Sequence, residues 1–581
     1  MKSVDAVKRK VRQLILAVAV FSALINLLAL AGPLYMMQIY DRVLSSNGIE
    51  TLVALSILLA ACYLLSGFLD FSRTGLMARV AQRFDKTIAL PAFDLTLTSG
   101  QNSSAASSLQ DLRIVRKFIA SPAIAAVFDG MWTPIFLLII FLIHPVLGSV
   151  AVAGGVVLMV LAVINQRRNA EPLRKAEETA READMLIAGY ARNIDAAKAM
   201  GMRDALRLRW ANVYRRSLDA GRVGADGIGA FSSATKALRL ALQSSILGVG
   251  AYLAILQEIT PGVMIASSIL VGRALAPIDQ GIAQWPAFVS ARAAWARLKK
   301  GLESADVQDS RRTELPAARG VLSAHDVAVY APSDLASAGL RSDAAGQPII
   351  DGVRFEIKPG DVLAVVGPSA SGKSTLAKSL AGAWAVGHGA IRLDGAELGT
   401  LSDAYRGSQI GFLPQDVELF EGTVAENIAR LAKNIDSDKV VSAAIDAGAH
   451  DMILRLSDGY ETQVGVGGRF LSGGQRQRIG LARALFGTPP LVILDEPNAN
   501  LDVAGETALS EAIEARKAKD LTTVIVTHRH SSLDVVTKML VMEGGRQKMF
   551  GDKDTVMARL SGAAAPGERK VTRLSVRGTK S

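Results

Sequence analysis

The chain has 581 residues, a formal net charge of +11 and 50% hydrophobic residues, which are concentrated in its first half. Its single cysteine, Cys62, lies inside an apolar run, which excludes a disulfide within the chain, a thiolate metal site and cysteine-protease chemistry. Much of the positive charge falls in segments expected to be cytoplasmic loops of a membrane protein, which disfavours nucleic-acid binding.

Six apolar segments approach the roughly 20 residues that a membrane-spanning helix needs. We place them at about 13–40, 50–75, 131–143, 146–166, 230–257 and 262–285. The third is the weakest by length and could start a turn earlier. The first apolar run continues from Leu14 to about Met37, well beyond the roughly 7–15 residues of a signal-peptide core. We therefore expect an uncleaved first membrane helix.

The distribution of basic residues predicts the orientation. The loops expected outside are short and carry one base, Arg42, whereas the segments 2–12, 73–117 and 167–222 are basic and expected inside. Both ends of the chain are then cytoplasmic. Segments 107–116 and 190–201 are candidate contact helices within the inside portions. Arg273 lies deep in the sixth span, and our hypothesis is that it lines a polar central path.

The composition divides the chain into a transmembrane domain at 1–300, a linker at 301–320, a second domain at 321–561 and a tail at 562–581. The linker is charged and polar and contains Pro316. The second domain has the strand and helix patterns of a soluble α/β fold. The tail is small, polar and basic, and we expect it to be disordered.

The second domain contains a phosphate-binding loop at Gly367–Ser374, which fits G-x-x-x-x-G-K-[ST] without mismatch. An apolar strand pattern precedes it and a helical pattern follows, so backbone N–H groups and a helix N-terminus would meet the phosphates. Lys373 would reach the β- and γ-phosphates, and the Ser374 hydroxyl would hold Mg²⁺. The residues expected to bind the nucleotide here are Gly367, Pro368, Ser369, Ala370, Ser371, Gly372, Lys373, Ser374 and Thr375.

A second motif, at 491–496, is an apolar strand that ends in two carboxylates, Asp495 and Glu496. This is the Walker B pattern. Asp495 would hold Mg²⁺, and Glu496 would position and deprotonate the attacking water. A helix cap is the structural alternative, but a phosphate-binding loop about 120 residues earlier favours the catalytic interpretation.

A third motif, LSGGQ at 471–475, opens a helix and predicts a second anion-binding N-terminus. One site does not need two such loops from the same chain, so Ser472, Gly474 and Gln475 are expected to contact the nucleotide of a second subunit. With these motifs the domain resembles the nucleotide-binding domain of an ABC transporter. No guanine-reading Asn-Lys-x-Asp motif is present, which favours ATP.

The resemblance implies further roles. Tyr330 matches the aromatic residue that stacks on adenine, Gln415 the Q-loop glutamine that links Mg²⁺ and water to the membrane domain, and His528 the switch histidine near the γ-phosphate. It implies Glu496, His528, Lys373 and Gln415 as catalytic residues, and Ser374, Gln415 and Asp495 as metal-binding residues. Two departures are an altered D-loop at 498–502 and a long insertion at 331–348.

The membrane half resembles the permease of bacterial type I secretion systems, in the branch that exports proteases, lipases and S-layer proteins. The segments that carry this resemblance are 35–44, 111–119 and 128–134. The implied fold is a six-helix ABC exporter domain fused to a P-loop ATPase. The resemblance implies a homodimer in the bacterial inner membrane, an unfolded cargo with a C-terminal signal, a periplasmic adaptor and an outer-membrane channel.

Only about a dozen residues precede the first span, so we expect no processing of leader peptides. Two alternative functions share the ATPase motifs. One is an ABC exporter of lipids or drugs. The other is a nucleotide-gated channel or regulatory subunit without pumping, against which Glu496 and His528 argue.

Overall fold

The computed structural model describes residues 2–98, 105–309, 315–330, 346–528 and 534–560. The chain forms two compact units, which divide between Asp306 and Val307. The predicted tail at 562–581 lies outside the described residues, as does most of the insertion at 331–348.

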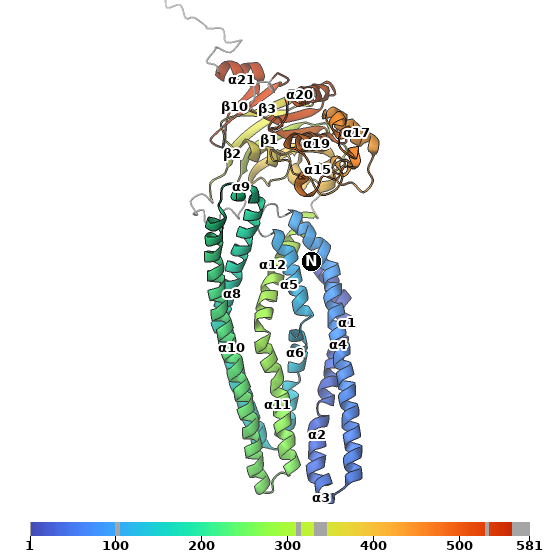
Figure 1. Cartoon of the computed structure of the whole chain (residues 1–581), viewed down its shortest axis with the longest axis vertical. Coiled ribbons are helices and arrows are strands. Elements are labelled where there is room, and N and C mark those ends of the chain that lie inside the picture. The colour runs from blue at the N-terminus through green and yellow to red at the C-terminus, as the bar shows by residue number, and fades with distance from the viewer. Residues whose placement is uncertain (1, 99–104, 310–314, 331–345, 529–533, 561–581) are drawn as a thin grey trace, which may run out of the picture. The chain divides into compact units, whose positions relative to one another are not determined.

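The first unit is entirely helical where the structure describes it, and six of its helical segments are long and apolar enough to cross a membrane. Figure 1 shows α8 and α10 side by side along most of their length. The helices are α1 (Lys2–Leu28), α2 (Ala31–Gln38), the π-helical turn η1 (Ile39–Val43), α3 (Leu44–Ser46), α4 (Ile49–Thr98), α5 (Ala105–Ile119), α6 (Pro122–Gly130), α7 (Thr133–Ile143), α8 (Pro145–Arg192), α9 (Ile194–Ala199), α10 (Arg203–Ile255), α11 (Pro261–Ala283) and α12 (Trp285–Asp309).

The third span begins earlier than the sequence predicted. It covers Pro122–Ile143, so the predicted range 131–143 was wrong at its N-terminal end. Ser121 caps α6 by accepting a hydrogen bond from the backbone N–H of Ala123, and Pro122 occupies a first-turn position that favours helix initiation. The sequence pattern did not reveal that α6 continues into α7, because the helix is interrupted between Gly130 and Thr133. The span is therefore two consecutive helices.

The predicted linker at 301–320 contains the division between the two units, and its first part is helical, because α12 continues to Asp309. The apolar residues Ala294, Leu298 and Leu302 recur every four residues and are buried against Phe84 and Ile88 of α4. This spacing aligns them on one face of a helix, so packing stabilises a segment whose overall composition is charged. The side chain of Arg297 on α12 also forms two hydrogen bonds with the buried carboxylate of Asp111 on α5.

A buried polar cluster joins α1, α4 and α6. Arg73, only 8% exposed, donates to Asp129 at 2.8 Å, to Asp70 at 2.7 Å and to the Ser22 hydroxyl at 3.0 Å. The side-chain amide of Asn26 donates to Asp129 at 2.9 Å. Asp70 and Arg73 lie one helical turn apart on α4, and this spacing accounts for their ion pair. Asp129 is the partner that sequence spacing could not reveal.

Replacement of Arg73 by Ala should destabilise the first unit by about 3–5 kcal/mol, because the largely buried carboxylate of Asp129 loses the cation that compensates its charge. The apparent unfolding temperature of the purified chain in detergent would report this loss. Arg79→Ala is the matched control, since Arg79 lies on the exposed side of the same helix. Equal unfolding temperatures for the two variants would contradict the structural role of the cluster.

The second unit contains a ten-stranded sheet in the order β5-β4-β1-β2-β10-β9-β3-β8-β7-β6. The strands are β1 (Leu322–Val329), β2 (Ile350–Ile357), β3 (Val362–Val366), β4 (His388–Leu393), β5 (Ala396–Glu397), β6 (Ile410–Leu413), β7 (Leu491–Asp495), β8 (Thr522–Val526), β9 (Lys538–Glu543) and β10 (Arg546–Asp552). The helices are α14 (Lys373–Leu380), η2 (Leu398–Thr400), α15 (Asp403–Gln409), α16 (Val424–Ile428), α17 (Ser437–Asp446), α18 (His450–Leu454), η3 (Gly459–Glu461), η4 (Val466–Gly468), α19 (Gly473–Leu485), α20 (Val503–Ala518) and α21 (Lys553–Leu560).

Hydrophobic cores cover both faces of the sheet. Along β3, Val362 and Ala364 belong to one core, whereas Leu363 and Val365 belong to the other. A strand buried on both faces is apolar at every position, which explains its continuous β-branched and apolar sequence. Strands β3, β8, β7 and β6 are neighbours and parallel. Their carboxyl ends therefore meet at one edge, where loops bind ligands in open parallel sheets.

Candidate functional site

The candidate site begins with the turn between β3 and α14. Gly367 has a φ of +154°, and a Cβ atom at this position would lie 2.1 Å from the Met542 carbonyl oxygen. Only glycine fits so close to a neighbouring backbone. Ala370 and Gly372 also have positive φ values, of 64° and 91°. The turn thus brings the backbone of the loop to the N-terminus of α14, as an anion cradle requires.

The Lys373 side chain bends back over this loop. Its ammonium donates hydrogen bonds to the carbonyl oxygens of Gly367, at 3.0 Å, and Pro368, at 2.7 Å. Burial lowers the pKa of Lys373, and the negative charges of Glu496 and Asp495 oppose that shift. A buried cation held by two neutral carbonyls is well placed to exchange these partners for phosphate oxygens.

Asp495 and Ser374 meet beneath the loop. The Ser374 hydroxyl donates to Asp495 Oδ1 at 3.2 Å, while Asp495 Oδ2 is buried and has no hydrogen-bond partner among the described residues. Burial raises the pKa of the Asp495 carboxyl, and the hydrogen bond from Ser374 opposes this. An unpaired buried carboxylate oxygen beside a hydroxyl suits a hard cation, so these residues fit Mg²⁺. Bound there, Mg²⁺ would neutralise phosphate charge.

Asp495→Asn should stabilise the nucleotide-free second unit by about 2–4 °C at neutral pH, although it removes the proposed metal ligand. A carboxyl whose pKa is raised by folding destabilises the folded unit as the pH rises above the pKa of the unfolded chain, near 4. The advantage of the variant should therefore grow as the pH rises from about 4, the unfolded value, through the raised pKa of the folded chain. Thermal unfolding without nucleotide or metal would measure it.

Asp502→Asn provides a control of opposite sign. Asp502 accepts a hydrogen bond from the backbone of Gly505 and pairs with Arg478, and these contacts lower its pKa. Its carboxylate stabilises the fold above the unfolded pKa and loses that effect in acid. This second variant should therefore lower the unfolding temperature at neutral pH. Equal shifts in the same direction would contradict the assignment of a destabilising charge to Asp495.

Glu496 connects two other predicted residues. Its Oε2 accepts a hydrogen bond from the Gln415 side-chain amide at 3.0 Å, and its Oε1 lies 3.5 Å from His528 Nε2. These three side chains follow β7, β6 and β8, so the parallel strands bring them together at the carboxyl edge. A partly exposed carboxylate held between an amide and an imidazole can accept a proton from a bound water.

The backbone of Glu496 is itself unusual. Its φ is +49°, a left-handed value that costs energy for a residue with a side chain, and its N–H donates to the Val526 carbonyl at 3.0 Å. The buried Gln477 of α19 donates to the Pro497 carbonyl at 3.0 Å and fixes the loop that follows. Sequence reasoning missed Gln477. The only signal was a polar residue at a helix position expected to be buried.

The LSGGQ motif forms the start of α19. Ser472 is the N-cap: its hydroxyl accepts from the backbone N–H of Gln475, and the Gln475 side chain accepts from the N–H of Ser472. This reciprocal capping leaves the N–H groups of Gly473 and Gly474 for another acceptor. A Cβ at Gly474 would lie 2.9 Å from the Asn500 carbonyl oxygen, so the altered D-loop packs against this helix start.

The structure does not bring all the predicted residues together within one chain. Among the described residues, no hydrogen bond or ion pair joins Ser472, Gly474 or Gln475 to the phosphate loop at 367–375. Tyr330 directly follows β1 and is 43% exposed, and its ring lies beside Gly387. The structure therefore brings Lys373, Ser374, Gln415, Asp495, Glu496 and His528 together, with the LSGGQ residues apart from them.

Comparisons with known families agree with both halves of the chain. A family model described as ABC transporter matches residues 350–499. A second model, described as ABC transporter transmembrane region, matches residues 15–275. The first range includes the phosphate loop and the LSGGQ helix, and the second includes most of the helical unit.

Individual relatives are similar over nearly the whole chain. The type I secretion system ATP-binding protein PrsD of Rhizobium meliloti is 39% identical over 96% of this chain and 94% of its own length. The cyclolysin secretion/processing ATP-binding protein CyaB of Bordetella pertussis is 28% identical over 94% of this chain and 76% of its own length. The fold is similar to the structure of a bacterial Atm1-family ABC exporter with ATP bound, with a TM-score of 0.77, 21% identity and coverage of 96% and 99%.

Proposed function

The chain belongs to the ABC transporters, among the type I secretion ATP-binding proteins, and we propose that it exports unfolded polypeptides as a homodimer in the bacterial inner membrane. It is a multi-pass membrane protein whose ATPase activity is coupled to transport. The observation that carries the choice of cargo is the end-to-end similarity to a type I secretion protein, at 39% identity.

In the proposed reaction, Glu496 removes a proton from the water that attacks the γ-phosphate. Gln415 and His528 hold this carboxylate from both sides, which supports their roles in orienting it and in contacting the phosphate. Lys373 neutralises charge on the transferred phosphoryl group, and Ser374 and Asp495 hold Mg²⁺. Tyr330 stacks on the adenine ring.

The separation of LSGGQ from the phosphate loop within one chain supports a site that is completed by a second copy. Two chains related by a twofold axis would form two such sites, each with the phosphate loop of one chain and the LSGGQ helix of the other. ATP then joins the two ATPase domains, and its hydrolysis releases them. This cycle gives the membrane helices two states between which nucleotide shifts the population.

The membership in this group supports further partners. We propose a periplasmic adaptor and an outer-membrane channel, with both termini and the ATPase domain in the cytoplasm. The cargo would carry an uncleaved C-terminal signal. The basic segments 73–117 and 167–222 support this orientation, because cytoplasmic loops carry an excess of Lys and Arg.

A peptide from the C-terminus of a cargo, chosen from proteins encoded beside this chain, should change the ATP hydrolysis rate of the purified chain in lipid nanodiscs by about twofold or more. A scrambled peptide of the same composition is the control. Co-purification with a periplasmic adaptor from the native membrane would give independent support. A rate that responds only to lipids or drugs would instead favour the alternative exporter function.

A further inference from the structure

A cavity of about 420 Å³ lies within the first unit, between α6, α7, α8, α11 and the start of α12. This volume is within the range of small-ligand pockets. Its wall is formed by 15 residues, most of them apolar and none of them charged. The nucleotide site and its motifs are in the other unit, so the ATPase chemistry does not account for this cavity.

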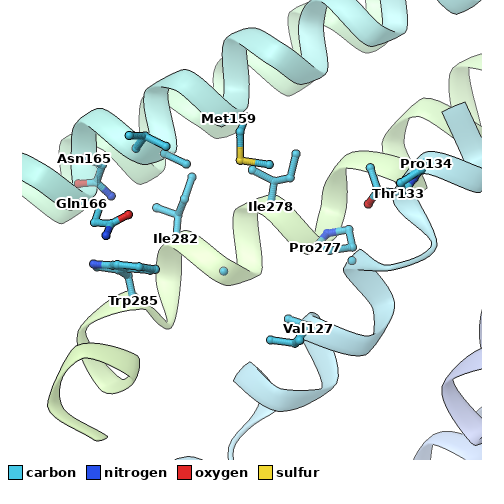
Figure 2. A pocket seen from close by; sticks show the side chains of 15 residues that line it. Val127, Thr133, Pro134, Met159, Asn165, Gln166, Pro277, Ile278, Ile282 and Trp285 are labelled. Carbon is cyan, nitrogen blue, oxygen red and sulfur yellow. The ribbon is translucent and has the colours of Figure 1, made fainter. Parts of the chain in front are cut away.

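The two ends of the cavity differ in polarity. Figure 2 shows Asn165, Gln166 and Trp285 at one end and Val127 with Pro134 at the other, with Met159 and Ile278 between them. The indole N–H of Trp285 is buried and has no hydrogen-bond partner in the described part of the chain. An occupant that offers a hydrogen-bond acceptor would remove the free-energy cost of this unpaired donor.

Two features shape the wall opposite α8. Pro277 lies inside α11 and lacks an N–H, so the helix cannot form its regular hydrogen bond there. The Thr133 hydroxyl of α7 donates to the neighbouring carbonyl of Ala274 at 2.8 Å and joins the two helices beside the break. Gly281 also lines the cavity, and a Cβ at this position would meet no atom within 4 Å. The cavity therefore has free space at a position with no side chain.

The lining favours a neutral occupant. The anionic head group of a phospholipid would be expected to pair with Arg or Lys, but Arg167 and Arg168 of α8 are exposed and do not line the cavity. An extended polypeptide segment suits this lining. Its carbonyl groups can accept from Trp285, and its side chains on one face repeat about every 7 Å. The polar end lies where the apolar run of α8 gives way to Arg167, at the expected cytoplasmic boundary of the membrane.

We propose that this cavity binds a bulky apolar side chain of an extended, uncharged segment of the cargo polypeptide. The side chain would lie against Met159, Ile278 and Ile282, and the adjoining backbone carbonyl would accept the Trp285 indole N–H. This inference rests on the proposed export of polypeptides. It assigns to α6, α8 and α11 a preference for apolar, uncharged cargo segments, which the ATPase motifs do not supply.

A photo-crosslinking experiment tests the proposal. The full chain in lipid nanodiscs is irradiated with a short glycine/serine peptide that carries one benzoylphenylalanine, and the attached residues are mapped by mass spectrometry. Labelling is expected within 159–166 or 277–285. Gly281→Leu should reduce this labelling about tenfold or more, since its side chain occupies the space that an apolar residue would bury.

Gly248→Leu is the matched control. Gly248 lies on α10, outside the cavity lining, and a Cβ there also meets nothing within 4 Å. It should label like the unmodified chain. Trp285→Phe removes the indole N–H together with part of the ring, leaves an aromatic side chain in the wall, and should lower labelling about threefold. The unfolding temperature of each variant verifies that the first unit is folded, and the tryptophan variant keeps the test decisive if Gly281→Leu does not fold.

Equal labelling of Gly281→Leu and Gly248→Leu would overturn the proposal. A phospholipid with a photoactivatable acyl chain provides a second test. If it selectively labels the same residues and Gly281→Leu abolishes that labelling, the cavity is a lipid site and the proposal is overturned. A parallel export assay separates the two hypotheses. If the chain exports a cargo with a C-terminal signal but Gly281→Leu and Gly248→Leu are labelled equally, only the cavity proposal is contradicted. If labelling depends on the cavity but no such cargo is exported, only the proposed export function is contradicted.

Discussion

Replacement of Glu496 by Gln should reduce the rate of ATP hydrolysis by about 10²–10⁴-fold, the range lost when a positioned general base is removed. Glutamine is nearly the same size as glutamate and can still accept the hydrogen bond from Gln415, but its amide cannot take a proton from water. Nucleotide binding should persist, because Lys373 and the phosphate loop are unchanged. The expected product is a chain that retains ATP and does not turn it over.

Phosphate release from the purified chain and retention of labelled ATP would measure the two effects separately. Glu511→Gln is the matched control, since Glu511 is exposed on α20 and is not part of the site. Its hydrolysis rate should equal that of the unmodified chain. Substantial hydrolysis by the Glu496 variant would show that another group accepts the proton.

The local geometry of the ATP site was predictable because short motifs determine it. The sequence around Gly367 requires a strand, a tight turn and a helix, and the structure forms β3, the turn and α14 there. The meeting of Gln415, Glu496 and His528 depends on the order of the three parallel strands β6, β7 and β8, which one sequence does not reveal without a family resemblance. The left-handed backbone of Glu496 was not predictable, since the surrounding contacts impose it on a residue that disfavours it.

In the membrane unit, composition located the spans but not their contacts. Asp70 and Arg73 are three residues apart on one helix, so their pairing follows from helical spacing. The bond from Arg73 to Asp129 joins residues 56 positions apart and depends on helix packing. The helical start of the linker was not predictable for a related reason. Its charged residues predicted a linker, whereas the periodic burial of Ala294, Leu298 and Leu302 stabilises a helix.

Whether two chains share each ATP site can be tested by mixing inactive variants. Lys373→Ala damages the phosphate-loop half of a site, and Ser472→Arg damages the LSGGQ half. Each homodimer should lose hydrolysis by about a hundredfold or more, since preorganised charge stabilisation is lost at both of its sites. In a mixed dimer, both defects fall in one shared site, and the other site keeps an intact loop and an intact LSGGQ helix.

Equal mixing with random pairing makes half of the dimers mixed, so the recovered rate should be about a quarter of the original if sites act independently. Phosphate release after co-reconstitution measures this recovery. The control mixes Lys373→Ala with Glu496→Gln. Both residues lie on the phosphate-loop side of a site, where the charge of Glu496 stabilises the buried lysine. In a mixed dimer of these two variants, each of the two sites therefore carries one defect, and no activity should return. Absence of recovery in the first mixture as well would contradict a site shared between two chains. Only a shared site places both defects in one site of the mixed dimer and leaves the other site intact.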